Sequence, residues 1–169
     1  RLGAPGLALQ PWQQIVVDGA AVVRLPDALG LPRWLWLGDA VAAESWTASL
    51  PAIQSEDWQW LDVQAGVATV CTATSAQFVP QMLNYEVVGG VDFRKGCYPG
   101  QEVVARSQYL GKLKRRAFLL TQDGGEAARP GQEIFWSEEP SQPAGMVAGA
   151  AQRGAQMALL AELKTAVVA

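Results

Sequence analysis

The second half of the chain is divided at short intervals by turn-forming residues. After Gly111, four apolar segments follow one another, and each has the length of a β-strand. They are Arg116–Thr121, Gln132–Trp136, Ala144–Ala148 and Ala155–Leu160. Dipeptides such as Gly124-Gly125 and Pro130-Gly131 separate them, and such dipeptides mark turns. Regularly spaced short strands with these turns predict a small antiparallel β-barrel over residues 112–169.

Residues 1–111 carry a different pattern, in which strand and helix signals are mixed. Two β-branched runs flank Asp18-Gly19, which predicts a hairpin. Trp34–Leu37 predicts a third strand, and Asp39 is placed to cap a helix over 40–50. The sequence therefore predicts an α+β fold, with one domain over 1–111 and the β-barrel over 112–169.

A further helix is predicted over 56–65. Ser55 is a suitable N-cap, and the acidic residues that follow it complement the partial positive charge of a helix N-terminus. Trp58, Leu61 and Ala65 would lie on its buried face. The helix would end close to Gln64.

The densest group of reactive side chains is Lys95-Gly96-Cys97-Tyr98-Pro99-Gly100-Gln101-Glu102, followed by Val103-Val104-Ala105-Arg106. Val91–Phe93 alternates apolar and polar residues like the end of a strand. Pro99 suits a first helical turn and Gly111 a stop, so a helix over 99–110 is expected. Cys97 would then occupy a corner between a strand and a helix.

Cys97 is a candidate reactive or metal-ligating sulfur. The N–H groups at a helix N-terminus and the ammonium of Lys95 both favour a thiolate. Cys71, by contrast, lies in the apolar run 67–71 and is expected to be a small buried side chain. Cys97 is therefore predicted to be the more reactive thiol, although a lone cysteine is often only a buried apolar residue.

The chain contains no histidine. This excludes catalysis by Ser-His-Asp or Cys-His groups within the chain and every zinc site that needs imidazole, and no metal site is predicted. Acid–base chemistry would have to come from carboxylate, lysine, tyrosine or a ligand. The two cysteines form no CxxC pair, so a reducing cytoplasm is the expected location. No apolar run approaches the roughly 18 residues that span a bilayer.

Positive charge is concentrated in one part of an acidic chain. Residues 94–116 contain seven cationic side chains and one carboxylate, a net charge of +6, which leaves −9 on the remainder of a chain whose total is −3. This distribution favours a local anion site over a surface that coats nucleic acid. For Lys112–Arg116, a solvated basic turn is the alternative interpretation.

Lys-Gly-Cys-Tyr-x-Gly-Gln-Glu with a downstream Ala-Arg resembles the signature of YgfZ-type folate-binding proteins, which are relatives of the aminomethyltransferase (T-protein) of the glycine cleavage system. The resemblance continues upstream through Ala65-Gly66-Val67, the run Gln77–Asn84 and Gly89-Gly90-Val91, and covers about residues 58–120. Proteins of this type carry a segment ahead of the matched part. Since the chain begins at Arg1 without methionine, we expect it to be a fragment.

The resemblance implies an aminomethyltransferase-like α+β domain, a tetrahydrofolate site and a role in iron–sulfur cluster assembly or repair. Through the cluster enzymes it would affect tRNA modification. Folate and iron–sulfur proteins are the implied partners, without direct contact to nucleic acid or membrane. Lys95 and Cys97 are the candidate catalytic residues. The candidate cofactor-binding residues are Gln64, Gln81, Tyr98, Gln101, Glu102 and Arg106.

Two alternatives differ from this expectation. The chain could be an enzyme, a folate-dependent aminomethyltransferase or demethylase, or it could be an interaction module whose basic turn binds an acidic partner. Gln64 bears on all three, because the relatives have glutamate there and that carboxylate meets the pterin ring. An amide cannot offer the same charged pair of acceptors. Glu102 and Arg106 are four residues apart, so an i,i+4 ion pair is an alternative to ligand contact.

Overall fold

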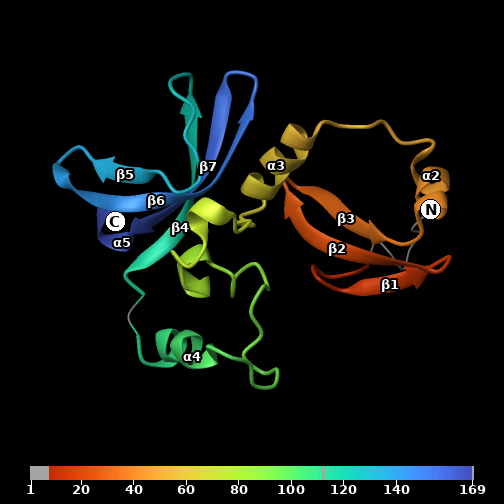
Figure 1. Cartoon of the computed structure of the whole chain (residues 1–169), viewed down its shortest axis with the longest axis horizontal. Helices are drawn as coiled ribbons and strands as arrows, with labels where there is room; N and C mark the ends of the chain where they lie inside the picture. Colours follow the sequence, from red (N-terminus) through yellow and green to blue (C-terminus); the bar gives the residue numbers. More distant parts are fainter. Residues whose placement is uncertain (1–7, 112, 169) are drawn as a thin grey trace. The chain divides into compact units, whose positions relative to one another are not determined.

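The computed structural model describes residues 8–111 and 113–168, and the chain forms two compact units that divide between Ser55 and Glu56. The first unit contains an antiparallel sheet and one described helix, and the second contains an antiparallel sheet and several helices, as Figure 1 shows. The fold is therefore mixed, with separate strands and helices, as the sequence predicts. The expected domain boundary between residues 111 and 112 falls inside the second unit. In the described residues, no helix has the length and apolar character needed to cross a membrane.

The first unit is built on a three-stranded sheet of order β1-β2-β3. Its strands are β1 (Gln14–Val17), β2 (Ala20–Ala28) and β3 (Leu31–Leu37). Asp18 and Gly19 join β1 to β2, and both have positive φ, at 51° and 80°, as a type I′ turn requires. The predicted hairpin and third strand are confirmed. The predicted helix over 40–50 is α2 (Ala40–Thr47), and the carboxylate of Asp39 accepts a hydrogen bond of 2.8 Å from the Val41 amide.

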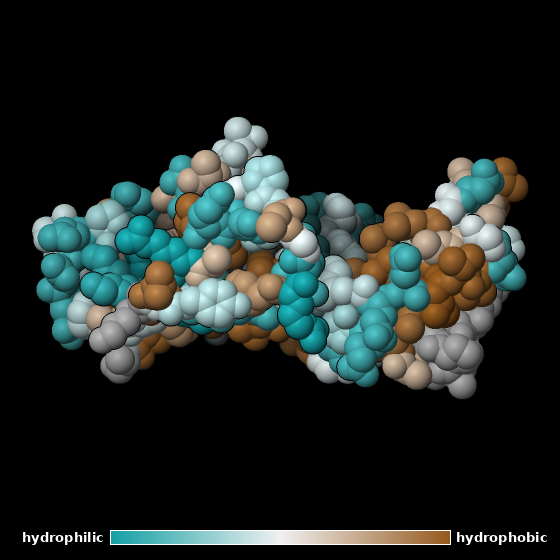
Figure 2. All heavy atoms as spheres, turned by 90° about the horizontal axis from the view of Figure 1, so that it is seen from below, coloured by the Kyte–Doolittle hydropathy of each residue, from teal (hydrophilic) through white to brown (hydrophobic). Residues whose placement is uncertain are grey.

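The two faces of this sheet differ in what covers them. On one face Trp36 packs against Trp46 of α2, with ring centroids 6.3 Å apart. On the other face Val16, Leu35 and Leu37 are exposed. Figure 2 shows the resulting apolar surface on this unit in brown.

The second unit is built on a four-stranded antiparallel sheet of order β4-β7-β6-β5. Its strands are β4 (Arg115–Asp123), β5 (Glu133–Trp136), β6 (Glu139–Arg153) and β7 (Gln156–Lys164), followed by the short helix α5 (Thr165–Val168). All four predicted strands are present. The predicted barrel is wrong, because no described strand pairing joins β4 to β5 and closure requires a continuous ring of pairs. β5 has only four residues, and its pairing with β6 shifts register twice.

One face of this sheet packs on helix α3 (Ser55–Gln64) and on the segment that follows it. Trp60 and Val63 are the buried residues of α3 and join Ala158 and Leu160 of β7 in one apolar cluster. The helix itself was predicted, but its buried face was placed wrongly: Trp58, Leu61 and Ala65 are only partly buried. The buried face of α3 is thus the one that carries Trp60 and Val63, and these two residues pack on the sheet.

Between α3 and β4 the chain forms two 3-10 helices and one α-helix. These are η1 (Thr72–Thr74), η2 (Pro80–Leu83) and α4 (Gln101–Tyr109). η2 contacts both α4 and β4. In Figure 1, α4 and the loop before it extend away from the sheet of their unit.

Candidate functional site

The loop ahead of α4 holds three of the predicted site residues together. The ammonium of Lys95 lies 4.9 Å from the centre of the Tyr98 ring, within the range of a cation–π contact. The Tyr98 amide donates to the side-chain oxygen of Gln101 at 3.3 Å, and the Gln101 amide donates to the Tyr98 carbonyl at 3.3 Å. This reciprocal pair closes the turn that leads into α4.

The segment before this loop corrects one prediction. Val91–Phe93 is not a strand, because the carboxylate of Asp92 accepts a hydrogen bond of 2.8 Å from the Arg94 amide and so makes a local turn. Phe93 packs edge-on against Tyr109, with centroids 6.1 Å apart. Helix α4 begins at Gln101, after Gly100 with φ of 82°. The partial positive charge of a helix N-terminus acts within the first helical turn. Cys97 lies outside that turn.

Both thiols are exposed and neither forms a disulfide. For Cys71 this contradicts the prediction of a buried side chain. Cys71 stands at the start of η1, where its sulfur lies 3.5 Å from the hydroxyl oxygen of Thr74 and its amide donates to that oxygen at 3.0 Å. The hydrogen bond from the Thr74 side chain, with further backbone hydrogen bonds, lowers the pKa of the Cys71 thiol.

Gln81 is buried, with 1% of its surface exposed. Its side-chain nitrogen donates a hydrogen bond of 2.6 Å to the carbonyl of Val104, the buried residue of α4. Its side-chain oxygen is also buried and has no hydrogen-bond partner among the described residues. The hydrogen bond fixes α4, and with it the loop that carries Cys97, to η2.

Arg116 ties the same region to the sheet. Its guanidinium donates to the Gln81 carbonyl at 3.1 Å and to the side-chain oxygen of Asn84 at 3.2 Å, and it forms an ion pair with Glu86. The side-chain nitrogen of Asn84 donates in turn to the Ala117 carbonyl at 2.8 Å. Sequence reasoning missed this role, because Arg116 stands in a run of cations that looks like a solvated turn. Lys112, also part of that run, lies outside the described residues.

Gln64 is the last residue of α3 and is partly buried. In the described part of the chain, no hydrogen bond joins its side chain to residues 95–106. Glu102 and Arg106 are both exposed on α4, and the i,i+4 ion pair considered above does not form between them. Of the predicted site residues, Lys95, Cys97, Tyr98 and Gln101 share one loop and helix start, while Gln64 stands at another helix end.

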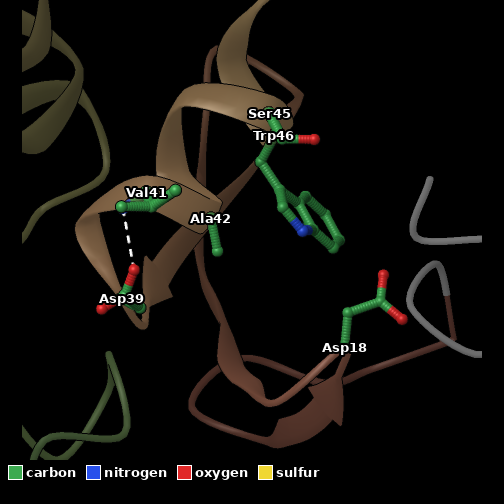
Figure 3. A pocket seen from close by; sticks show the side chains of 6 residues that line it. All are labelled: Asp18, Asp39, Val41, Ala42, Ser45 and Trp46. Carbon is green, nitrogen blue, oxygen red and sulfur yellow. Dashed lines mark hydrogen bonds between the residues drawn. The ribbon is translucent and has the colours of Figure 1, made fainter.

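A hollow of about 740 Å³ lies in the first unit and contains none of the predicted site residues. It is lined by Asp18, Asp39, Val41, Ala42, Ser45 and Trp46. Figure 3 shows the carboxylate of Asp18 and the indole of Trp46 on opposite sides of it. Its two carboxylates would repel the glutamyl carboxylates of folate, so this hollow does not suit that ligand.

No protein-family model matches the chain, so membership of the resembling family is a proposal. Among the residues with described positions, no group of three or more histidine, cysteine, aspartate or glutamate side chains is arranged to hold a metal ion.

Proposed function

We propose that this chain is part of a folate-binding accessory protein of the YgfZ type, with an aminomethyltransferase-like fold, that supports iron–sulfur cluster assembly or repair. One observation carries the proposal. Lys95 and Cys97, the motif residues with reactive groups, are exposed on a loop. The helix that follows this loop, α4, is held to η2 by the hydrogen bond from Gln81 to Val104. Both side chains are thus accessible to a ligand, although the Lys95 ammonium also contacts the Tyr98 ring.

The donor set suits a folate molecule in three respects. The ammonium of Lys95 can bind a carboxylate of the glutamyl tail, and the Tyr98 ring offers an apolar face to the aromatic part of the ligand. Gln64, with its partly buried amide, can both donate to and accept from the pterin edge. Gln101 and the exposed Glu102 and Arg106 complete the polar surroundings. When bound, tetrahydrofolate supplies a carrier for one-carbon groups.

Gln81 has a positioning role in this proposal, since its amide nitrogen is bound to Val104 inside the protein. Cys97 would bind iron through its sulfur after losing its proton to solvent. The iron–sulfur cluster is then substrate, and a cytoplasmic protein that serves cluster enzymes would influence tRNA modification through them. This assignment gives the exposed thiol of Cys97 a role. In a folate-dependent aminomethyltransferase the same thiol would have none.

Calorimetric titration of the protein with tetrahydrofolate tests the proposed ligand. The wild-type protein should bind, and Lys95→Ala should weaken binding by about fivefold, the scale of one exposed charge pair. Lys114→Ala removes the same charge from another exposed lysine and should change affinity by less than about twofold. Absence of binding, or equal loss in both variants, would contradict the proposal.

The iron–sulfur role has a separate test in cells. Replacing the endogenous protein by Cys97→Ser should lower the activity of iron–sulfur enzymes, whereas Cys71→Ser, which changes the other exposed thiol, should not. Equal activities in the two strains would remove Cys97 from the proposed chemistry while leaving folate binding to be judged by calorimetry.

A further inference from the structure

The hollow in the first unit takes no part in the proposed folate site, and its lining combines negative charge with apolar surface. Asp18 and Asp39 supply two carboxylates, and none of the described lining residues is a lysine or an arginine. Trp46 contributes an indole ring, and Val41 and Ala42 contribute aliphatic groups. Such a lining suits a ligand that carries a positive charge on an apolar body.

The two carboxylates differ in how far the fold uses them. Asp39 caps α2, and one of its oxygens accepts the hydrogen bond from the Val41 amide. Asp18 stands in the turn between β1 and β2, and its side chain forms no hydrogen bond or ion pair with another residue that the structure describes. Figure 3 shows the indole of Trp46 extending from α2 toward Asp18 across the hollow. Asp18 and the second oxygen of Asp39 are therefore available to a ligand.

The exposed charged side chains of the first unit are all acidic within residues 8–55. They are Asp18, Asp27, Asp39 and Glu44. The two arginines of this part, Arg24 and Arg33, are 8% and 5% exposed, and both donate hydrogen bonds to backbone carbonyls of β2. Arg24 also pairs with Asp27, away from the lining of the hollow. Since no exposed cation of residues 8–55 offsets the two lining carboxylates, the local potential favours a positively charged ligand.

We propose that this hollow binds a small organic ammonium ion. The ammonium group would meet the carboxylates of Asp18 and Asp39. The alkyl chain would lie against Val41 and Ala42, and the Trp46 ring would attract the positive charge through its π face.

The size of the hollow favours a free amine over a lysine side chain of a partner protein. Its volume of about 740 Å³ falls in the range of about 300–1,000 Å³ of pockets that enclose a small molecule. The hollow contains none of the residues assigned to folate. The proposal therefore goes beyond the proposed function and does not depend on it.

An NMR titration tests the site with butylammonium as the probe. In protein labelled with ¹⁵N at tryptophan, the indole N–H signal of Trp46 is identified by its loss in Trp46→Phe. Butylammonium should shift this signal in the wild-type protein with a Kd on the order of 1–10 mM, as expected for so small a ligand. Butanol keeps the alkyl chain without the charge, and potassium keeps the charge without the chain. Both should bind at least about fivefold more weakly.

Two conservative substitutions remove the charges and keep the local structure. Asp18→Asn retains a residue suited to a type I′ turn, and Asp39→Asn retains an N-cap. Each should weaken butylammonium binding by about threefold, and the double variant by about tenfold. Glu44→Gln is the matched control, because it removes an exposed carboxylate of α2 that does not line the hollow. It should change the affinity by less than about twofold.

Four results would overturn the proposal. The first is a Trp46 signal that butylammonium does not move. The second is butanol binding as tight as that of butylammonium, since the hollow would then have no preference for charge. The third is an equal loss of binding in Glu44→Gln and the double variant, which would assign the attraction to the overall charge of the unit. The fourth is equally tight binding of a glycine pentapeptide with one central lysine, since the hollow would then suit the lysine side chain of a partner protein.

Discussion

The side-chain amide of Gln81 donates a hydrogen bond of 2.6 Å to the backbone carbonyl of Val104. The two residues are 23 positions apart in the sequence and belong to two of the stretches on which the proposed family resemblance rests. Their contact explains how a helix with one buried residue is held to η2. The contact also keeps the polar side chain of Gln81 buried. Neither the composition nor the periodicity of the sequence indicates a buried polar residue at this position.

Replacing Gln81 by leucine should reduce the free energy of unfolding by about 1–3 kcal/mol, because the Val104 carbonyl loses a buried donor. It should also speed amide hydrogen exchange in α4, since the helix loses its main polar attachment. Gln77→Leu, at an exposed position, is the control and should stay within about 0.5 kcal/mol of wild type. Unchanged exchange in α4 would show that the bond does not hold the helix.

Gly145 marks a position where strand β6 approaches β7 too closely for any side chain. A Cβ atom there would lie 1.9 Å from the Glu162 carbonyl oxygen. Gly145→Ala should therefore destabilise the protein by about 1–3 kcal/mol or more through forced separation of the strands. Gly96→Ala adds the same methyl group where nothing lies within 4 Å. Thermal unfolding of both variants would contradict this account if their midpoints were equal.

Glu162 is buried on β7 and forms an ion pair of 3.0 Å with Arg115. Burial raises the pKa of its carboxyl group, and Arg115 offsets part of that rise. A raised folded-state pKa means that the folded protein binds the proton more tightly than the unfolded chain. The stability from this group is therefore present below its unfolded pKa of about 4.3 and is lost as pH rises through the folded value.

The corresponding experiment is denaturant unfolding of wild type and Glu162→Gln at several pH values. Wild type should lose stability relative to the variant as pH rises above the unfolded pKa of about 4.3. Glu133→Gln, an exposed position on β5, is the matched control. A constant difference between wild type and Glu162→Gln over this range would mean that burial does not govern the titration.

Thr74 should control the reactivity of the Cys71 thiol, whose pKa its hydroxyl lowers. In a Cys97→Ser background, Thr74→Val should raise the pKa of that thiol and slow its alkylation by iodoacetamide at neutral pH. Thr72→Val removes a neighbouring exposed hydroxyl and should leave the rate unchanged. Equal alkylation rates in the two variants would mean that backbone hydrogen bonds, and not the Thr74 hydroxyl, lower the pKa of the Cys71 thiol.

Short-range signals predicted most of the secondary structure. Asp18-Gly19 fixed the first hairpin because its backbone conformation excludes most other residues, and Asp39 began α2 through one side-chain bond. Barrel closure was predicted wrongly, since it depends on whether the two edge strands, β4 and β5, pair with each other, and short-range signals do not report which strands pair. The strand expected at Val91–Phe93 failed for a local reason, because Asp92 turned the chain.

The candidate site likewise contains contacts that the sequence could predict and contacts that it could not. The sequence could place Lys95, Tyr98 and Gln101 together because they are neighbours along the chain. It could not foresee that Arg116 joins η2 to β4 through Asn84, since that contact spans more than thirty positions. The exposure of Cys71 was also missed, because an apolar run does not reveal which of its residues the fold turns outward.

Folate binding is the central claim, and Gln64 tests it most directly. If this amide reads the pterin edge, Gln64→Glu should strengthen tetrahydrofolate binding by about 1–3 kcal/mol, because a carboxylate accepts both pterin donors with a charge. Gln59→Glu adds the same charge at an exposed position of the same helix and should have little effect. Calorimetry should therefore show tighter binding for Gln64→Glu alone. Equal affinities in all three proteins, or no binding by any of them, would contradict the account.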